Sequence, residues 1–125
     1  MSTMFAAALL GAALAGCVTE QLPPMDPRIT VAGNLGERVY VTELRCVEGS
    51  GGFRTFQALT VNTTGLELPV QWRAVWYDGD GMEIDTIVSS WNDAMLQPNE
   101  TKGLMCTAPS PDAEDVRIYI REMPR

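Results

Sequence analysis

Apolar and polar residues alternate with a period of two along most of the chain after Arg28, and no helical period is sustained. Such alternation places successive side chains on opposite faces of a strand. The expected strands are 28–33, 38–47, 53–62, 68–77, 82–88, 101–108 and 115–121, with 89–99 as the longest loop. About seven short strands separated by turns predict an all-β, immunoglobulin-like antiparallel β-sandwich over residues 28–125.

The segment 68–77 has the clearest division into two faces. Its first face carries Val70, Trp72, Ala74 and Trp76, and its second carries Gln71, Arg73, Val75 and Tyr77. A row of apolar residues on one face is typical of a core, so we expect Trp72 and Trp76 to be buried. Trp91 lies in the predicted loop, and it is the tryptophan that we expect to be exposed.

The first 16 residues differ from the rest of the chain. Residues 4–16 are apolar and uncharged, which is too short for a membrane-spanning helix and typical of the core of a signal peptide. The run ends in Leu14-Ala15-Gly16-Cys17, which resembles a bacterial lipobox. This resemblance implies cleavage before Cys17 and acylation of its thiol and amine, which would anchor the protein stably in a membrane. The other interpretation is a short buried helix followed by an ordinary thiol.

Three prolines and two acidic residues lie between the lipobox and the domain. We therefore expect residues 17–27 to form an extended tether that reaches up to ~30 Å from the lipid surface. Val18 follows the cysteine where an aspartate would retain some lipoproteins in the inner membrane. By that resemblance, the expected location is the periplasmic face of the outer membrane.

The composition excludes several classes of function. The chain has 9 Lys+Arg against 16 Asp+Glu, a formal net charge of −7, and no histidine. An acidic domain of this kind is poorly suited to bind nucleic acid, because binding to phosphates requires clusters of basic residues. Without histidine, the usual general base and the histidine-containing zinc sites are absent. We therefore expect a protein that is not an enzyme and has no cofactor, no catalytic residues and no metal site.

Cys46 and Cys106 are the cysteines that remain once Cys17 is acylated. They lie in predicted strands that face each other in many immunoglobulin-like sandwiches, and the periplasm permits disulfides. A bridge between them would contribute roughly 4 kcal/mol by restricting the unfolded chain. We therefore predict a disulfide between the two sheets. The alternative is two separate buried thiols that pack as small apolar groups.

Four acidic residues in the segment 78–85 suggest a calcium loop at first sight. Counted from Asp78, however, Met82, Glu83 and Ser89 occupy positions 5, 6 and 12 of an EF-hand, so the motif fails. The repeated Asp-Gly pair instead predicts a hairpin turn. Asn62-Thr63-Thr64 is likewise interpreted as a turn.

Charge is unevenly distributed along the domain. Residues 66–115 carry ten acidic residues against Arg73 and Lys102, whereas residues 116–125 carry three arginines against Glu122. We identify Arg73, Arg117, Tyr119 and Arg121 as a candidate strip for binding an anion or a protein partner. The simpler interpretation is that these side chains are solvated and that the arginines prevent edge pairing.

Several segments of the domain form a recognisable set: the turn Trp76-Tyr77-Asp78-Gly79-Asp80-Gly81-Met82-Glu83, then Trp91, Pro98, Ala108-Pro109 and 117–121. Together they resemble the YcfL-like family of small Gram-negative lipoproteins. The resemblance covers roughly residues 28–122 and implies a periplasmic sandwich tethered to the outer membrane, without catalytic residues. We therefore expect the domain to bind another cell-envelope protein. The alternative is a module that binds carbohydrate or peptidoglycan, which requires exposed aromatic rings on one face.

Overall fold

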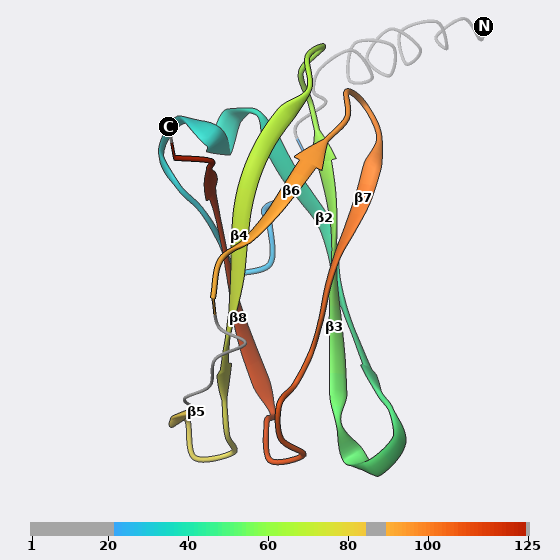
Figure 1. The fold of residues 1–125 in the computed structure, drawn as a ribbon, viewed down its shortest axis with the longest axis vertical. Coiled ribbons are helices and arrows are strands. Elements are labelled where there is room, and N and C mark those ends of the chain that lie inside the picture. Colours follow the sequence, from blue (N-terminus) through green and yellow to red (C-terminus); the bar gives the residue numbers. More distant parts are fainter. Residues whose placement is uncertain (1–21, 85–89, 125) are drawn as a thin grey trace, which may run out of the picture.

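The computed structural model describes residues 22–84 and 90–124, and within these ranges the chain forms eight strands in two sheets (Figure 1). The strands are β1 (Ile29–Val31), β2 (Val39–Glu48), β3 (Arg54–Asn62), β4 (Leu68–Tyr77), β5 (Glu83–Ile84), β6 (Asn92–Leu96), β7 (Thr101–Thr107) and β8 (Asp115–Glu122), with short 3-10 turns η1 (Gly33–Glu37) and η2 (Ser50–Gly52). None of the described helical turns is long and apolar enough to cross a membrane. The predicted signal peptide and Cys17 lie outside the described residues.

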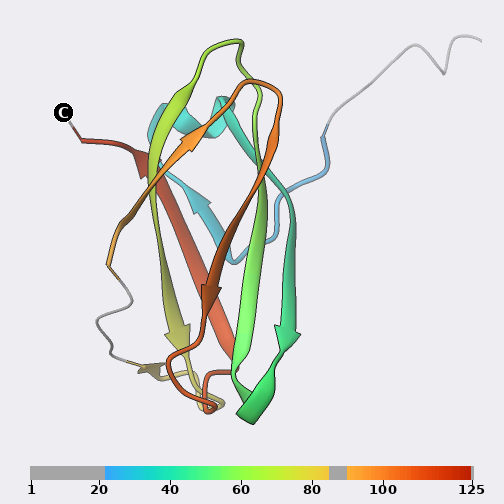
Figure 2. The same cartoon turned by 45° about the vertical axis from the view of Figure 1, so that its right-hand side comes forward.

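The two sheets pack face to face, which confirms the predicted β-sandwich (Figure 2). The larger sheet has the order β1-β8-β4, and both β5 and β6 pair with the far edge of β4. The smaller sheet has the order β2-β3-β7. One pairing departs from the antiparallel prediction, because β1 runs parallel to β8 and pairs Ile29 with Ile118.

The core lies between the sheets and follows the alternation in β4. Trp72 and Trp76 are 8% and 1% exposed, so their prediction as core residues is confirmed. The ring of Trp76 meets that of Phe56 from the smaller sheet, with centroids 5.3 Å apart and planes tilted by 59°. A tilted contact of this kind suits the charge distribution of aromatic rings.

The region between β4 and β7 differs most from the prediction. Residues 89–99 were expected to form a loop, but they contain β6, which pairs with the first half of β4. Asn92, Asp93 and Pro98 are typical of turns, and they obscured a short edge strand whose Leu96 is fully buried. Of the expected strand 82–88, Glu83 and Ile84 form β5, and residues 85–89 lie outside the described part.

The predicted tether is not a free spacer over its whole length. Met25 packs against the core, and its sulfur accepts a hydrogen bond from the backbone N–H of Val41 at 3.3 Å. The hydroxyl of Tyr40 donates to the carbonyl of Pro23. Arg28 donates to both carboxylate oxygens of Asp26, and this hydrogen bonding lowers the pKa of Asp26. The segment 23–28 is therefore held against the domain beside the first half of β2.

Asn62, at the end of β3, connects the two sheets by hydrogen bonds. Its side-chain nitrogen donates to the carbonyls of Leu66 at 2.7 Å and of Leu96 in β6 at 3.0 Å. Its side-chain oxygen accepts from the backbone N–H and the hydroxyl of Thr64. The residue is completely buried, and both ends of the amide are satisfied. The turn predicted at Asn62-Thr63-Thr64 is confirmed.

We expect Asn62→Ala to lower the free energy of unfolding by about 3 kcal/mol, because it removes the donor to the buried carbonyl of Leu96 and the side-chain acceptor of Thr64 from a fully buried position. The melting temperature should fall by roughly 10–20 °C. The matched control is Asn34→Ala, because Asn34 is exposed in η1. Thermal and urea denaturation of the two variants measure the difference, and equal stability of both would contradict this role for Asn62.

The structure corrects the predicted Cys46–Cys106 disulfide, since both cysteines are free. Cys46 pairs with Phe56 on one side of β3, and Cys106 pairs with Phe56 on the other. The cysteines thus belong to one sheet with a strand between them, which separates their Cα atoms by about 10 Å. A disulfide requires less than ~7 Å. Cys106 packs against the core, and burial raises the pKa of its thiol to about 12, whereas Cys46 is exposed.

Alkylation distinguishes the two thiols. With iodoacetamide at pH 8 and no reductant, we expect Cys46 to be modified and Cys106 to be protected, because Cys106 is shielded and remains protonated. Peptide mapping resolves them, since trypsin separates 46–54 from 103–117. Protection of both cysteines until a reductant is added would instead indicate a bridge.

The raised pKa of Cys106 also makes the stability of the fold depend on pH. Because the folded-state pKa of Cys106 is raised, its contribution to stability is complete below pH 9 and is lost between pH 9 and about 12.

Candidate functional site

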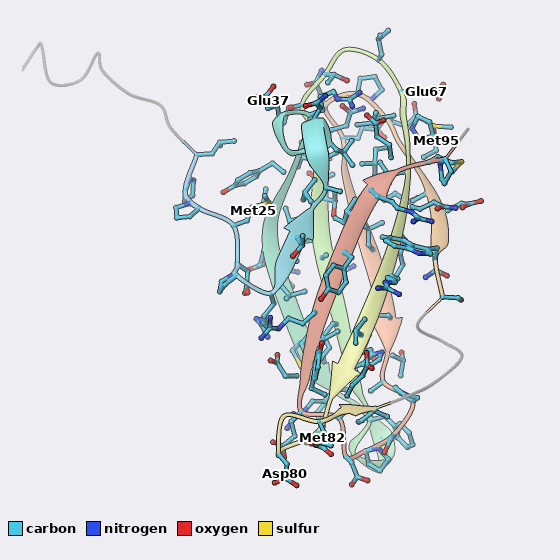
Figure 3. All side chains as sticks on the ribbon, turned by 90° about the vertical axis from the view of Figure 1, so that its left-hand side faces the viewer. Met25, Glu37, Glu67, Asp80, Met82 and Met95 are labelled. Carbon is cyan, nitrogen blue, oxygen red and sulfur yellow. The ribbon has the colours of Figure 1, made fainter. Side chains whose placement is uncertain are left out.

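The outer face of the larger sheet carries the most distinctive set of side chains, and this face is turned to the viewer in Figure 3. The pairing of β4 with β8 places Gln71 opposite Arg121, Arg73 opposite Tyr119 and Val75 opposite Arg117. Directly opposite residues point to the same side of a sheet, and successive rows are about 6.6–6.8 Å apart along the strands. The outward residues of the two strands therefore form consecutive rows.

The four residues predicted as a binding strip all lie on this face, and we call them the cationic strip: Arg73, Arg117, Tyr119 and Arg121. Trp91, which directly precedes β6, joins them. The guanidinium carbon of Arg121 lies 3.7 Å from the Trp91 ring centroid, and that of Arg73 lies 5.1 Å from the same ring and 5.4 Å from that of Tyr119. These contacts have cation–π geometry, and they hold the arginines against aromatic rings.

Arg121 is held by a second contact in addition to the tryptophan. Its Nε and Nη2 atoms both donate to the side-chain oxygen of Gln71, at 3.1 and 2.8 Å. The amide nitrogen of Gln71 then donates to Asp93 at 2.9 Å. Asp93 is therefore bound by a neutral amide, and Gln71 positions the positive charge of Arg121 without a salt bridge to any carboxylate among residues 22–84 and 90–124.

The charges of the strip are not neutralised by neighbours in the described part of the chain. The salt bridges within residues 22–84 and 90–124 involve Arg28, Arg38 and Arg45, and none includes Arg73, Arg117 or Arg121. The Nε atom of Arg73 is buried and has no hydrogen-bond partner there. In a chain of net charge −7, three arginines held by aromatic rings and an amide form a preorganised positively charged surface, with the charge and donor groups that suit an anion.

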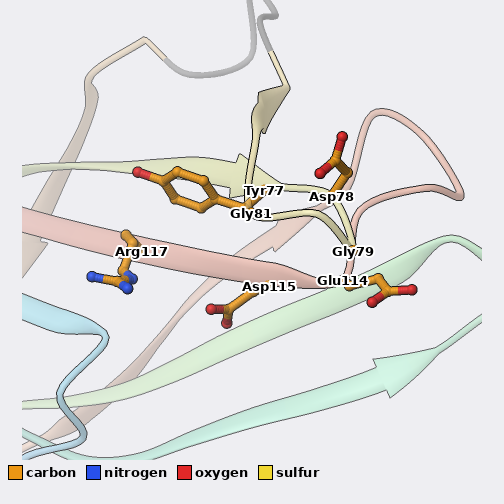
Figure 4. Close-up of a pocket in the computed structure, with 7 residues that line it drawn as sticks. All are labelled: Tyr77, Asp78, Gly79, Gly81, Glu114, Asp115 and Arg117. Carbon is orange, nitrogen blue, oxygen red and sulfur yellow. The ribbon is translucent and has the colours of Figure 1, made fainter.

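The strip ends at an open hollow of about 440 Å³ at the β5 end of the sandwich. Figure 4 shows Tyr77 and Arg117 at one side of this hollow and Asp78 and Glu114 at the other. Arg117 lies 5.8 Å above the ring of Tyr77. The Asp78 carboxylate accepts from the backbone N–H groups of Asp80 and Met82, which confirms the predicted turn. These carboxylates make the hollow unfavourable for anions, so they mark one boundary of the cationic strip.

The sequence identified the arginines of this surface but missed the parts that hold them. Trp91 was expected to be exposed, whereas it is half-buried beside Arg73 and Arg121. Gln71 and Asp93 were not recognised as members of the site. The signal that was missed is the alternation of side chains along 91–96, in and just before β6. The outward side chains are Trp91, Asp93 and Met95, and they alternate with half-buried Ala94 and inward Leu96. Recognition of that period would have placed the three outward residues beside β4.

Comparisons with known proteins agree with this fold. The crystal structure of Campylobacter jejuni cj0090 superposes with a TM-score of 0.67 at 18% identity and covers 78% of this chain and 100% of that chain. A DUF1425 family member from Shewanella sp. pv-4 superposes with a TM-score of 0.62 at 20% identity, covering 70% and 80%. No curated protein matches the sequence. The family model described as "Protein of unknown function (DUF1425)" matches residues 28–122, and the chain therefore belongs to the DUF1425 family.

Proposed function

We propose that this protein is a YcfL-like, lipid-anchored and non-enzymatic binding protein on the periplasmic face of the outer membrane. Its cationic strip binds an acidic surface of another cell-envelope protein. The observation that carries this proposal is the stacking of Arg73 and Arg121 on Trp91 and Tyr119 without carboxylate partners among the described residues. The lipobox at Cys17 supports the anchor.

The preorganised arginines favour recognition of carboxylates. A free arginine side chain loses rotamer entropy when it is fixed in an interface. In the strip, Arg121 is already fixed by Trp91 and Gln71, and Arg73 contacts the rings of Trp91 and Tyr119. Binding of a carboxylate to these arginines therefore costs less conformational entropy than binding to a free arginine side chain. Arginine and aromatic residues are also enriched among the residues that dominate protein–protein interfaces.

The alternative, a carbohydrate or peptidoglycan module, has less support from this geometry. Sugar stacking requires open aromatic faces, and two of the three tryptophans are buried in the core. The third, Trp91, has the guanidinium of Arg121 at 3.7 Å from its ring centroid. A sugar ring would have to displace that arginine, which is also bound to Gln71.

Replacement of Cys17 tests the location. We expect Cys17→Ala protein to be absent from the outer-membrane fraction and to be recovered as soluble or unprocessed protein, because it lacks the acylated thiol. Quantitative blotting of membrane fractions measures the distribution, and Cys46→Ser is the matched control because Cys46 is an exposed cysteine of the domain. Wild-type fractionation of the Cys17→Ala protein would contradict the lipid anchor.

Substitution of two arginines tests the binding surface. A photo-crosslinking amino acid at Thr30, which is exposed and paired with Tyr119, should form an adduct with one acidic envelope protein in living cells. We expect Arg117→Gln together with Arg121→Gln to reduce this adduct at least fivefold, since the partner loses two charge-assisted contacts. Arg45→Gln is the control, because Arg45 is an exposed arginine of β2 in the other sheet.

Two results would contradict the proposed partner class. The first is an adduct whose yield is the same in the double arginine variant and in Arg45→Gln. The second is saturable quenching of tryptophan fluorescence by muropeptides, which would favour the carbohydrate alternative.

A further inference from the structure

The cationic strip is bordered by three apolar residues at the end opposite the acidic hollow. Pro69 pairs with Met95 in β6, and the backbone N–H of Met123 donates to the carbonyl of Pro69 at 3.4 Å. We call these three residues the apolar row. Met95 is 45% exposed, Pro69 is exposed and Met123 is half-buried. In Figure 3, Met95 lies near the upper end of this face, and Asp80 and Met82 lie near the lower end.

The apolar row is in register with the strip. Pro69 is two residues before Gln71 in β4, and Met95 and Met123 are two residues after Asp93 and Arg121. It therefore occupies the row next to Arg121, about 7 Å away along the strands. From one end to the other, the face presents an apolar row, the row of Arg121, the row of Arg73 and the row of Arg117, followed by the carboxylates of the hollow.

An extended peptide has the same repeat as these rows. Its alternate side chains point to one side and are about 6.6–6.8 Å apart. A peptide that lies along β4 can therefore place one side chain over each row. The order of the rows determines which side chains fit, because an apolar residue suits the methionines and acidic residues suit the arginines.

We propose that the cationic strip and the apolar row together bind an extended acidic segment of a protein partner, with the pattern apolar-x-acidic-x-acidic-x-acidic. This rests on the proposed function and specifies the chemistry of its partner. The apolar side chain contacts Met95 and Pro69, and the acidic side chains contact the arginines. The carboxylates of the hollow limit the acidic run at the Arg117 end.

An anionic bilayer surface also combines charge with apolar groups, but the charge of the whole chain disfavours it. A bilayer presents an extended negative surface, and it would repel a domain whose residues 66–115 carry ten acidic residues against two basic ones. A short peptide interacts mainly with charges within a Debye length of about 8 Å. The three rows that it would cover carry Arg73, Arg117 and Arg121 against Asp93, so the local charge favours a peptide.

Fluorescence anisotropy with labelled synthetic peptides tests the pattern on the full chain. The probe is Leu-Thr-Glu-Thr-Glu-Thr-Glu, and two related peptides replace either the leucine by threonine or all glutamates by glutamine. We expect the glutamine peptide not to bind, and the threonine peptide to bind about fivefold more weakly than the probe. Arg117→Gln should weaken the probe about three- to fivefold, with Arg45→Gln unchanged.

The variant Met95→Thr isolates the apolar contact. It should weaken the leucine probe about fivefold and leave the threonine peptide unaffected, because the two changes remove the same contact. Met105→Thr is the matched control, since Met105 is 56% exposed on β7 in the other sheet. Equal binding of the leucine and threonine peptides would overturn the apolar-acidic pattern while leaving an acidic partner possible. Failure of every acidic peptide to bind would overturn both proposals, as would arginine-dependent binding to phosphatidylglycerol vesicles without peptide binding.

Discussion

The alternation of inward and outward side chains along β4, with a period of two residues, is the constraint on which the rest of the structure depends. One strand supplies Trp72, Ala74 and Trp76 to the core and Gln71 and Arg73 to the candidate site. A shift of one residue would bury an arginine and expose two tryptophans, so the burial of the indoles fixes the register of the whole strand. That register in turn determines which side chains of β6 and β8 meet on the outer face. Core packing and the alignment of the cationic strip therefore have a common cause.

The outer face shows how a surface can hold positive charge in an acidic protein without neutralising it. Elsewhere on the described domain, salt bridges satisfy Arg28, Arg38 and Arg45, and backbone carbonyls satisfy Arg54. On the strip, aromatic rings and the Gln71 amide take that role, and the nearby Asp93 is bound by the same amide. Rings and amides position a guanidinium but leave its full charge available to a ligand. This is the physical difference between the strip and the other charged surfaces of the described domain.

The sequence predicted the sandwich and most of its strands because long alternating segments, such as 53–62 and 68–77, depend on local pattern alone. It missed β6 because five residues rich in turn formers carry little periodic signal. The cysteine prediction was wrong for another reason: it depended on which strands are neighbours, and strand order is a tertiary property. Similarly, the charge pattern of the sequence was enough to predict the arginines of the site. Their stacking on Trp91 could not be predicted, because it depends on the position of β6 beside β4.

The segment at 23–28 limits how far the domain could move from a membrane. In the proposed lipid-anchored form, contacts of Pro23 and Met25 with β2 leave six residue steps between Cys17 and the first contact. These span at most about 20 Å, less than the ~30 Å of a tether that is free to residue 27. The domain would then explore a thinner layer of periplasm, which raises its effective concentration for partners in the same membrane. A docked tether thus favours neighbours that are themselves held at the bilayer over freely diffusing ones.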